Sequence, residues 1–203
     1  MKILNEKSLM QQALGEKWHE LPQGLKAHYD HDKQGSNYAT GVLTVNYPWF
    51  MQWPMSMLRL MGALLNKRGI DLKTTVRKSM KNGQQQWHRE ISYPNGKTVT
   101  FNSLFTMTKK KIFIEYTNKY LGMKMKPFVK GKQLIYQSCG YVFKLGKFMI
   151  PIPEWLVLGH GTIIETAVSV DEFDMDFRLN HWLFGEVFSY TGRFKTLSKT
   201  INS

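Results

Sequence analysis

One arginine on an aromatic strand face could recognise an anionic group. Residues 86–93 alternate with a period of two, so Trp87, Arg89, Ile91 and Tyr93 share one face. The guanidinium of Arg89 therefore stands among apolar and aromatic side chains. It must be paired there, because an unpaired buried charge is costly.

A carboxylate has a similar setting near the end of the chain. The alternation of Phe184, Glu186, Phe188 and Tyr190 places Glu186 among aromatic residues. We hypothesise that Arg89 and Glu186 line one interior, either paired with each other or presented to the headgroup of a ligand. A structural ion pair, or an arginine that faces water at a barrel mouth, would explain the same pattern. The predicted ligand-binding residues are Arg89, Trp87, Tyr93, Ser103, Glu186, Tyr190 and His181.

Other ionisable residues offer acid–base chemistry. Glu115 and Glu165 lie in apolar predicted strands, and two neighbouring carboxylates can divide the roles of acid and base. The sequence leaves open whether any two are close. His160 stands between two glycines in a predicted tight turn, whereas His28 and His31 near a helix end are interpreted as surface polarity. An enzyme is therefore an alternative hypothesis, with its catalytic residues unassigned.

Sequence motifs for metals and cofactors are absent. The single cysteine and the six histidines form no multi-ligand pattern. The sequence also lacks a Gly-rich phosphate loop, a nucleophile elbow and a dinucleotide fingerprint. We therefore expect neither a metal nor a cofactor.

The net charge of +13 is unevenly distributed. Residues 66–147 contain 18 Lys and Arg against three acidic residues, whereas residues 148–192 contain one basic residue against seven acidic ones. A dense positive field attracts the phosphates of nucleic acid or of anionic lipid, although solvated strand faces give the same counts. Because no helix-turn-helix, paired Cys/His finger or RNP-like pattern is present, we do not expect nucleic acid as a partner. An anionic membrane surface stays open as a partner.

The pattern of the chain predicts helices near its start and in one apolar segment. Ser8 begins a capping box, and a second short helix begins near Pro22. Pro54 begins a helix to Leu65 that is apolar around nearly its whole circumference, so it must be buried or must touch lipid or a partner. The residues predicted to form a portal or a membrane contact on this segment are Trp49, Phe50, Trp53 and Met57.

Strands dominate the rest of the chain. Asn82-Gly83 and Asn95-Gly96 are hairpin signals. We predict one domain over residues 1–203 of a β-rich α+β class. Its expected architecture is a curved antiparallel sheet or incomplete β-barrel, with N-terminal helices and one apolar helix packed on it. The predicted strands lie near residues 41–47, 72–80, 86–93, 98–106, 112–118, 133–144, 162–170, 173–179 and 187–194.

Short segments spread along the chain form a recognisable series. They are Leu14-Gly15, Leu21-Pro22, Trp87-His88-Arg89, Phe101-Asn102-Ser103, Ile150-Pro151-Ile152-Pro153, His181-Trp182-Leu183-Phe184-Gly185 and Tyr190-Thr191-Gly192-Arg193-Phe194. In this order they resemble the DUF4166 family, a domain of unknown function that occurs alone or fused to other modules, including short-chain-dehydrogenase-like proteins. The resemblance covers roughly residues 9–196 and implies an architecture but no known activity.

The favoured hypothesis is a binding module. A curved sheet can enclose an apolar or amphiphilic anionic small molecule or lipid. The alternatives are an enzyme that acts on a small or lipid-like substrate and a regulatory protein-interaction domain. An apolar cavity with one cationic group would favour binding, whereas converging carboxylates or a histidine with a carboxylate would favour an enzyme.

The sequence also sets an expectation about location. Its first residues contain no signal-peptide hydrophobic region, and prolines and polar residues interrupt the apolar stretch over residues 45–65. We expect a soluble cytoplasmic protein. The oligomeric state stays open.

Overall fold

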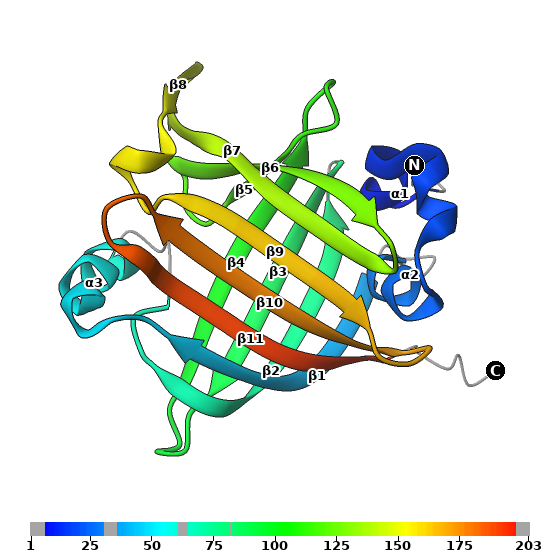
Figure 1. Cartoon of the computed structure of the whole chain (residues 1–203), viewed down its shortest axis with the longest axis horizontal. Helices are drawn as coiled ribbons and strands as arrows, with labels where there is room; N and C mark the ends of the chain where they lie inside the picture. Colours follow the sequence, from blue (N-terminus) through cyan, green and yellow to red (C-terminus); the bar gives the residue numbers. More distant parts are fainter. Residues whose placement is uncertain (1–6, 31–35, 61–64, 82, 198–203) are drawn as a thin grey trace.

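Eleven antiparallel strands form one sheet that curls into a barrel in the computed structural model, which describes residues 7–30, 36–60, 65–81 and 83–197 (Figure 1). Along the sheet the strands follow the order β6-β5-β4-β3-β2-β1-β11-β10-β9-β7-β8. The strands are β1 (Ser36–Asn46), β2 (Gly69–Lys81), β3 (Gln84–Ser92), β4 (Thr98–Met107), β5 (Phe113–Tyr116), β6 (Leu121–Lys130), β7 (Gln133–Leu145), β8 (Phe148–Ile152), β9 (His160–Ala167), β10 (Glu172–His181) and β11 (Gly185–Leu197).

The prediction of an incomplete barrel is wrong, because β6 also pairs with β7 and closes the sheet. This ladder runs from Leu121 opposite Phe143 to Lys130 opposite Gln133. It leaves a closed barrel of ten strands, with β8 attached to the second half of β7. The sequence pattern missed β6, since Gly122 is unfavourable in a strand and the lysines between its apolar residues hide the alternation.

The two predicted hairpins are confirmed. β2 and β3 pair from Lys73 opposite Ser92 to Lys81 opposite Gln84, and β3 pairs with β4 in the same antiparallel manner. Gly83 and Gly96 have φ angles of 75° and 77°, a left-handed conformation that glycine adopts without steric cost. Asn82 lies outside the described residues.

Helices lie at both ends of the barrel (Figure 1). At one end are α1 (Leu9–Leu14), the 3-10 helix η1 (Gly15–Glu20) and α2 (Gln23–Tyr29). As predicted, the Ser8 hydroxyl accepts the Gln11 N–H at 3.2 Å and α2 follows Pro22. At the other end are η2 (Trp49–Met51) and α3 (Gln52–Leu60). A third 3-10 helix, η3 (Glu154–Leu156), follows β8.

The apolar helix is shorter in the described chain than the sequence predicted. It begins at Gln52, so Pro54 lies in its first turn, and residues 61–64 of the predicted helix lie outside the described part. Met55 on this helix is fully buried, whereas Met57 is exposed. No helix in the described ranges is long and apolar enough to cross a membrane.

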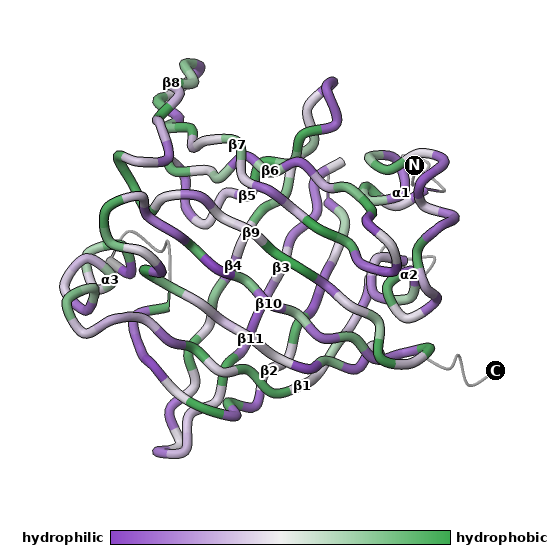
Figure 2. The backbone as a smooth tube through the Cα atoms, in the orientation of Figure 1, coloured by the Kyte–Doolittle hydropathy of each residue, from purple (hydrophilic) through white to green (hydrophobic). Residues whose placement is uncertain are grey.

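The inward side chains of the strands form an aromatic core. Apolar and polar residues alternate along several strands, as the colours of Figure 2 show. The inward members include Leu72 on β2, Phe173 and Phe177 on β10, and Phe188 and Phe194 on β11. Burying each such side chain stabilises the fold by roughly 1.5–3 kcal/mol.

We expect Gly24→Ala to destabilise the protein by about 1–3 kcal/mol, because an added Cβ would overpack the contact of α2 with the β9–β10 turn. That Cβ would lie 2.3 Å from the Ser169 carbonyl oxygen and 3.0 Å from that of Glu172. The gain of about 0.5–1 kcal/mol from replacing glycine in a helix is too small to compensate. Urea unfolding measures the difference, and the exposed Gln23→Ala serves as control. Equal stability of the two variants would contradict this account of α2 docking.

Candidate functional site

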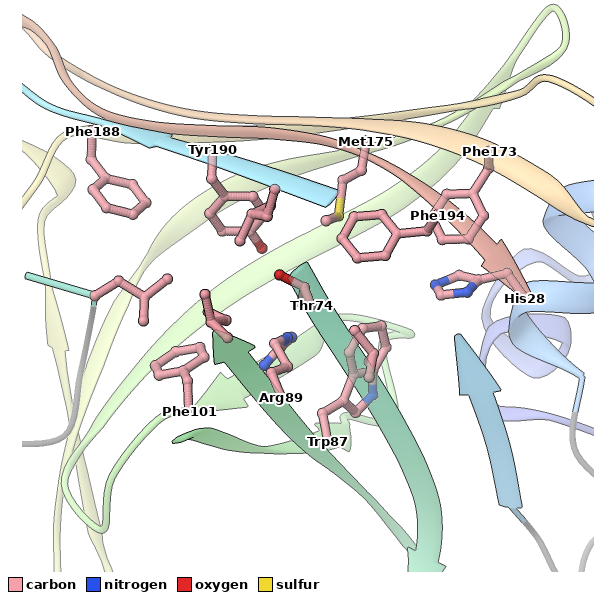
Figure 3. Close-up of a pocket in the computed structure, with 14 residues that line it drawn as sticks. His28, Thr74, Trp87, Arg89, Phe101, Phe173, Met175, Phe188, Tyr190 and Phe194 are labelled. Carbon is pink, nitrogen blue, oxygen red and sulfur yellow. The ribbon is translucent and has the colours of Figure 1, made fainter. Parts of the chain in front are cut away.

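Two small cavities lie inside the barrel. The first, of about 40 Å³, is lined mainly by apolar side chains, with His28, Thr74 and Arg89 among the polar ones (Figure 3). The second, of about 60 Å³, has Glu115 and Thr117 on its wall. Phe101 and Tyr190 line both cavities, so these two rings separate them. The apolar walls of the first cavity include Leu43, Phe101, Phe173, Met175, Phe188 and Phe194.

Arg89 occupies the interior position that the sequence predicted. It projects from β3, donates to the Ser103 hydroxyl of β4 at 2.8 Å and donates to Glu115 of β5 at 3.2 Å. Its guanidinium also lies over the rings of Trp87 and Phe101, at 4.7 and 5.2 Å. An arginine has five N–H donors, so three remain without a partner among the described residues.

The hypothesis that Arg89 and Glu186 line one interior is wrong. Glu186 lies on the outer surface, where it accepts hydrogen bonds from Arg178 and from the Ser189 hydroxyl, both at 2.9 Å. The reason is a bulge. Leu179 lies opposite Phe188 but Asn180 lies opposite Glu186, so one extra residue in β11 reverses the side to which Glu186 points.

Lys78 is a second interior cation, which the sequence analysis did not identify. It is 2% exposed and extends from β2 toward α2. Its ammonium lies 2.7 Å from His28 Nε2 and donates to the His28 carbonyl oxygen at 2.8 Å. It also lies over the rings of Tyr29 and Trp87, at 4.4 and 4.1 Å. No ion pair joins it to a carboxylate in the described part of the chain. Burial holds the Lys78 pKa well below its usual range, although the charge of Glu165 opposes this in part.

His28 presents an unused polar atom inside the barrel. The sequence pattern predicted a surface position for His28. The side chain is instead buried, with 3% of its surface exposed. When Lys78 is an ammonium, which can only donate, His28 Nε2 accepts from it and the ring proton resides on Nδ1. That Nδ1 has no hydrogen-bond partner among the described residues. Burial, and next the charge of Lys78, lower the His28 pKa, so the ring is neutral.

A chain of two tyrosines ends on a buried carboxylate. The Tyr136 hydroxyl donates to the Tyr29 hydroxyl, which lies 2.7 Å from both carboxylate oxygens of Glu165. Burial raises the pKa of both tyrosines, which therefore stay neutral donors. Burial also raises the Glu165 pKa to about 7, although Lys78 and the bond from Tyr29 act against the shift. Glu115 and Glu165 thus have separate partners rather than forming a carboxylate pair.

The other predicted site residues are divided between the interior and the ends of the barrel. Trp87 and Tyr190 line the first cavity, and Figure 3 shows Tyr190 and Arg89 reaching into it from opposite walls. The Tyr190 hydroxyl has no hydrogen-bond partner within the described ranges. Tyr93 lies at the α3 end, where its hydroxyl donates to the Lys67 carbonyl oxygen at 3.0 Å.

His181 does not lie with the interior residues. It is the last residue of β10, before the turn into β11, where Nε2 donates to the Trp155 carbonyl oxygen at 2.7 Å and Nδ1 accepts the Leu183 N–H at 3.2 Å. Both ring nitrogens are thereby used to hold this turn against η3. The ring has a structural role there, since neither nitrogen is left for a ligand.

A serine, a histidine and a glutamate also meet between β7, η3 and β9. The Ser138 hydroxyl donates to Glu154 and accepts the Gly161 N–H at 2.7 Å. His160 Nδ1 lies 3.0 Å from the same carboxylate. Burial alone would raise the Glu154 pKa, but hydrogen bonds from Ser138, His160 and a backbone N–H lower it overall. The Ser138 hydroxyl also lies 3.3 Å from His160 Nδ1, but that nitrogen donates to the Glu154 carboxylate and so has no lone pair with which to accept the serine proton. The arrangement therefore holds β7, η3 and β9 together and does not activate Ser138 as a nucleophile.

The sequence did contain a signal for the Lys78 site. Leu72, Thr74, Val76 and Lys78 alternate on one face of β2, so the lysine shares the side of the apolar residues. On α2, His28 follows Leu25 by three residues, which places both on one helix face. Neither pattern shows that the two faces meet.

We expect the stability of the protein to fall relative to that of Glu165→Gln as the pH rises. Folding raises the Glu165 pKa from 4.5 to about 7 and so favours the protonated carboxyl. The protonated carboxyl therefore contributes to the free energy of unfolding below pH 4.5, and this contribution is lost as the pH rises through 7. The loss is on the order of 3 kcal/mol. Urea unfolding of both proteins across this range measures it, with the exposed Glu16→Gln as control. Parallel profiles for the wild type and Glu165→Gln would show that the carboxyl is not perturbed.

Comparisons with known proteins identify a family. No curated protein matches the sequence. Among solved structures, the chain is similar to a mutant of the fluorescent protein UnaG, with 13% identity and a TM-score of 0.33 over 81% of this chain and 96% of that one. A TM-score of that size does not establish a common fold. The family model described as "Domain of unknown function (DUF4166)" matches residues 21–194, which is most of the chain, and the protein therefore belongs to the DUF4166 family.

Proposed function

We propose that the barrel interior binds a small amphiphile with one acidic group. The observation that carries this proposal is an apolar cavity whose wall includes a few polar side chains with spare hydrogen-bond donors. Arg89, the Nδ1 of His28 and the hydroxyl of Tyr190 all belong to residues that line it. The buried Nδ1 of His28 has no partner among the described residues, and such a donor is costly, so an acceptor supplied by a ligand would stabilise it.

The charge of the interior favours an acidic ligand. Arg89 is paired with Glu115, whereas Lys78 has no paired carboxylate in the described chain. The nearby Glu165 has a pKa of about 7, so it carries only part of a negative charge at neutral pH. Burial holds the Lys78 pKa well below its usual range, and a carboxylate bound nearby would favour the charged ammonium.

The size of the cavities limits the ligand. Pockets that bind drug-sized molecules have volumes of roughly 300–1,000 Å³, whereas the two cavities offer about 40 and 60 Å³. A compact aromatic or short-chain acid therefore suits the observed space. A longer ligand must displace Phe101 and Tyr190, the two rings between the cavities, and so join them.

Catalysis is a second candidate, favoured by the Glu165 pKa of about 7, which suits a general acid or base at neutral pH. However, neither Glu165 nor Lys78 is among the residues that line the two cavities. A substrate held in the observed space would meet His28 but neither of these groups. The geometry therefore supports binding better than turnover.

The first test is native against denaturing mass spectrometry of the freshly purified protein, with organic extraction of any released molecule. The proposal predicts a stoichiometric, extractable small acid or, for an empty protein, uptake of phenylpropionate in calorimetry. The amide of the same compound should bind at least about tenfold more weakly, because hydrogen bonds to a charged acceptor are the stronger ones.

Two variants test the roles of the interior donors. Arg89→Met should remove the preference for the acid over the amide, and Tyr190→Phe should lower affinity for the acid by roughly fivefold, since it removes one donor. Arg193→Met is the matched control, because Arg193 forms an exposed ion pair with Asp174. An empty protein that binds neither probe, or an Arg89→Met variant with unchanged preference, would refute the proposal.

A further inference from the structure

The exposed tryptophans all lie at the α3 end of the barrel. The chain has six tryptophans, of which Trp18 and Trp87 are each only 8% exposed. The other four are 58–78% exposed and belong to three separate segments that Figure 1 places at this end: η2 with α3, η3, and the β10–β11 turn. They are Trp49, Trp53, Trp155 and Trp182.

These segments form one continuous surface, which we call the aromatic rim. Phe50 of η2 lies 5.9 Å from Phe184 of the β10–β11 turn, measured between ring centroids, and Phe184 stacks on His181 at 5.0 Å. His181 in turn donates to the carbonyl oxygen of Trp155 in η3. Further exposed apolar side chains extend the rim. Its members are Trp49, Phe50, Trp53, Met57, Trp155, Leu156, Trp182, Leu183 and Phe184.

The side chains of the rim suit the boundary between lipid and water. Tryptophan has a large apolar ring with one N–H donor, which is why it concentrates at membrane interfaces. The rim lies on turns and short helices that project from the barrel end, rather than on a flat strand face. Large exposed apolar patches mark a contact with a partner or a membrane.

Basic residues next to the rim favour an anionic lipid surface. Arg68 lies over the ring of Tyr47, two residues before Trp49, and the nearby Lys67 lies over Tyr93. The β7–β8 hairpin, which leads into η3 along the chain, carries Lys144 and Lys147 together with exposed apolar side chains at Leu145, Phe148 and Met149. Glu154 and Glu186 are the carboxylates closest along the chain to the rim residues. Glu154 contacts His160 and Glu186 is paired with Arg178, so both negative charges are partly offset. The net charge of +13 adds a long-range attraction.

We propose that the aromatic rim docks the barrel, α3 end first, on an anionic phospholipid bilayer. The tryptophan rings enter the headgroup region, and Arg68, Lys144 and Lys147 face the phosphates. This proposal is independent of the interior ligand, because no rim residue lines either internal cavity.

Sedimentation with vesicles of equal parts phosphatidylcholine and phosphatidylserine tests the docking. The wild type should pellet with these vesicles, and its tryptophan emission should shift to the blue and be quenched by brominated lipid. The variant with both Trp49→Ser and Trp182→Ser should have a partition coefficient at least about tenfold lower, because two apolar rings no longer leave water. Val170→Ser is the matched control, since Val170 is 70% exposed in the β9–β10 turn at the opposite end.

Charge reversal tests the role of the basic residues. The variant with both Lys144→Glu and Lys147→Glu should bind at least about tenfold more weakly, as should the wild type in high salt or on phosphatidylcholine alone. The Arg89→Met variant should bind vesicles like the wild type, because Arg89 is not part of the rim. Vesicle binding therefore tests the rim independently of ligand binding in the interior.

Three results would overturn the proposal. The first is wild-type protein that stays in the supernatant, and the second is full vesicle binding by the double tryptophan variant. The third is a dimer in analytical ultracentrifugation that becomes monomeric in the same variant, which would assign the rim to a contact between two copies of the chain.

Discussion

The ladder between β6 and β7 encloses the inner face of the sheet. Without it, β6 and β7 would both present free edges and the inward side chains would remain open to water on that side. With it, ten strands surround a volume filled by aromatic and aliphatic side chains. Closure therefore creates the low-dielectric surroundings in which the interior charges of this protein must be accommodated.

Those charges are accommodated in two groups. The charge of Arg89 is stabilised by an ion pair with Glu115 and by a hydrogen bond to Ser103, as is usual for an interior cation. Lys78 does not, and depends instead on the lone pair of a histidine, a carbonyl oxygen and two aromatic faces. All of these except Trp87 belong to α2, so this helix both caps the barrel and stabilises the lysine.

The same enclosure separates the two proposed activities in space. The interior offers polar donors in a small apolar volume, which can select a compact acid but has little room for a long chain. The aromatic rim offers large apolar rings with adjacent positive charge on the outside. A protein that used both would meet a membrane at the α3 end while holding a ligand between that end and the α2 cap.

The sequence by itself determined the local features of this protein. Period-two alternation assigned Trp87, Arg89 and Tyr93 to one face of β3, because side chains of a strand alternate whatever its neighbours are. Turn glycines marked both hairpins, and the DUF4166 resemblance was confirmed.

Tertiary structure decided which faces meet. Glu115, rather than Glu186, pairs with Arg89 because a bulge in β11 reverses the direction of Glu186. Lys78 meets His28 across 50 residues, and Tyr29 meets Glu165 across 136. Strand order and barrel closure bring such groups together, and they depend on long-range pairing that no local pattern encodes.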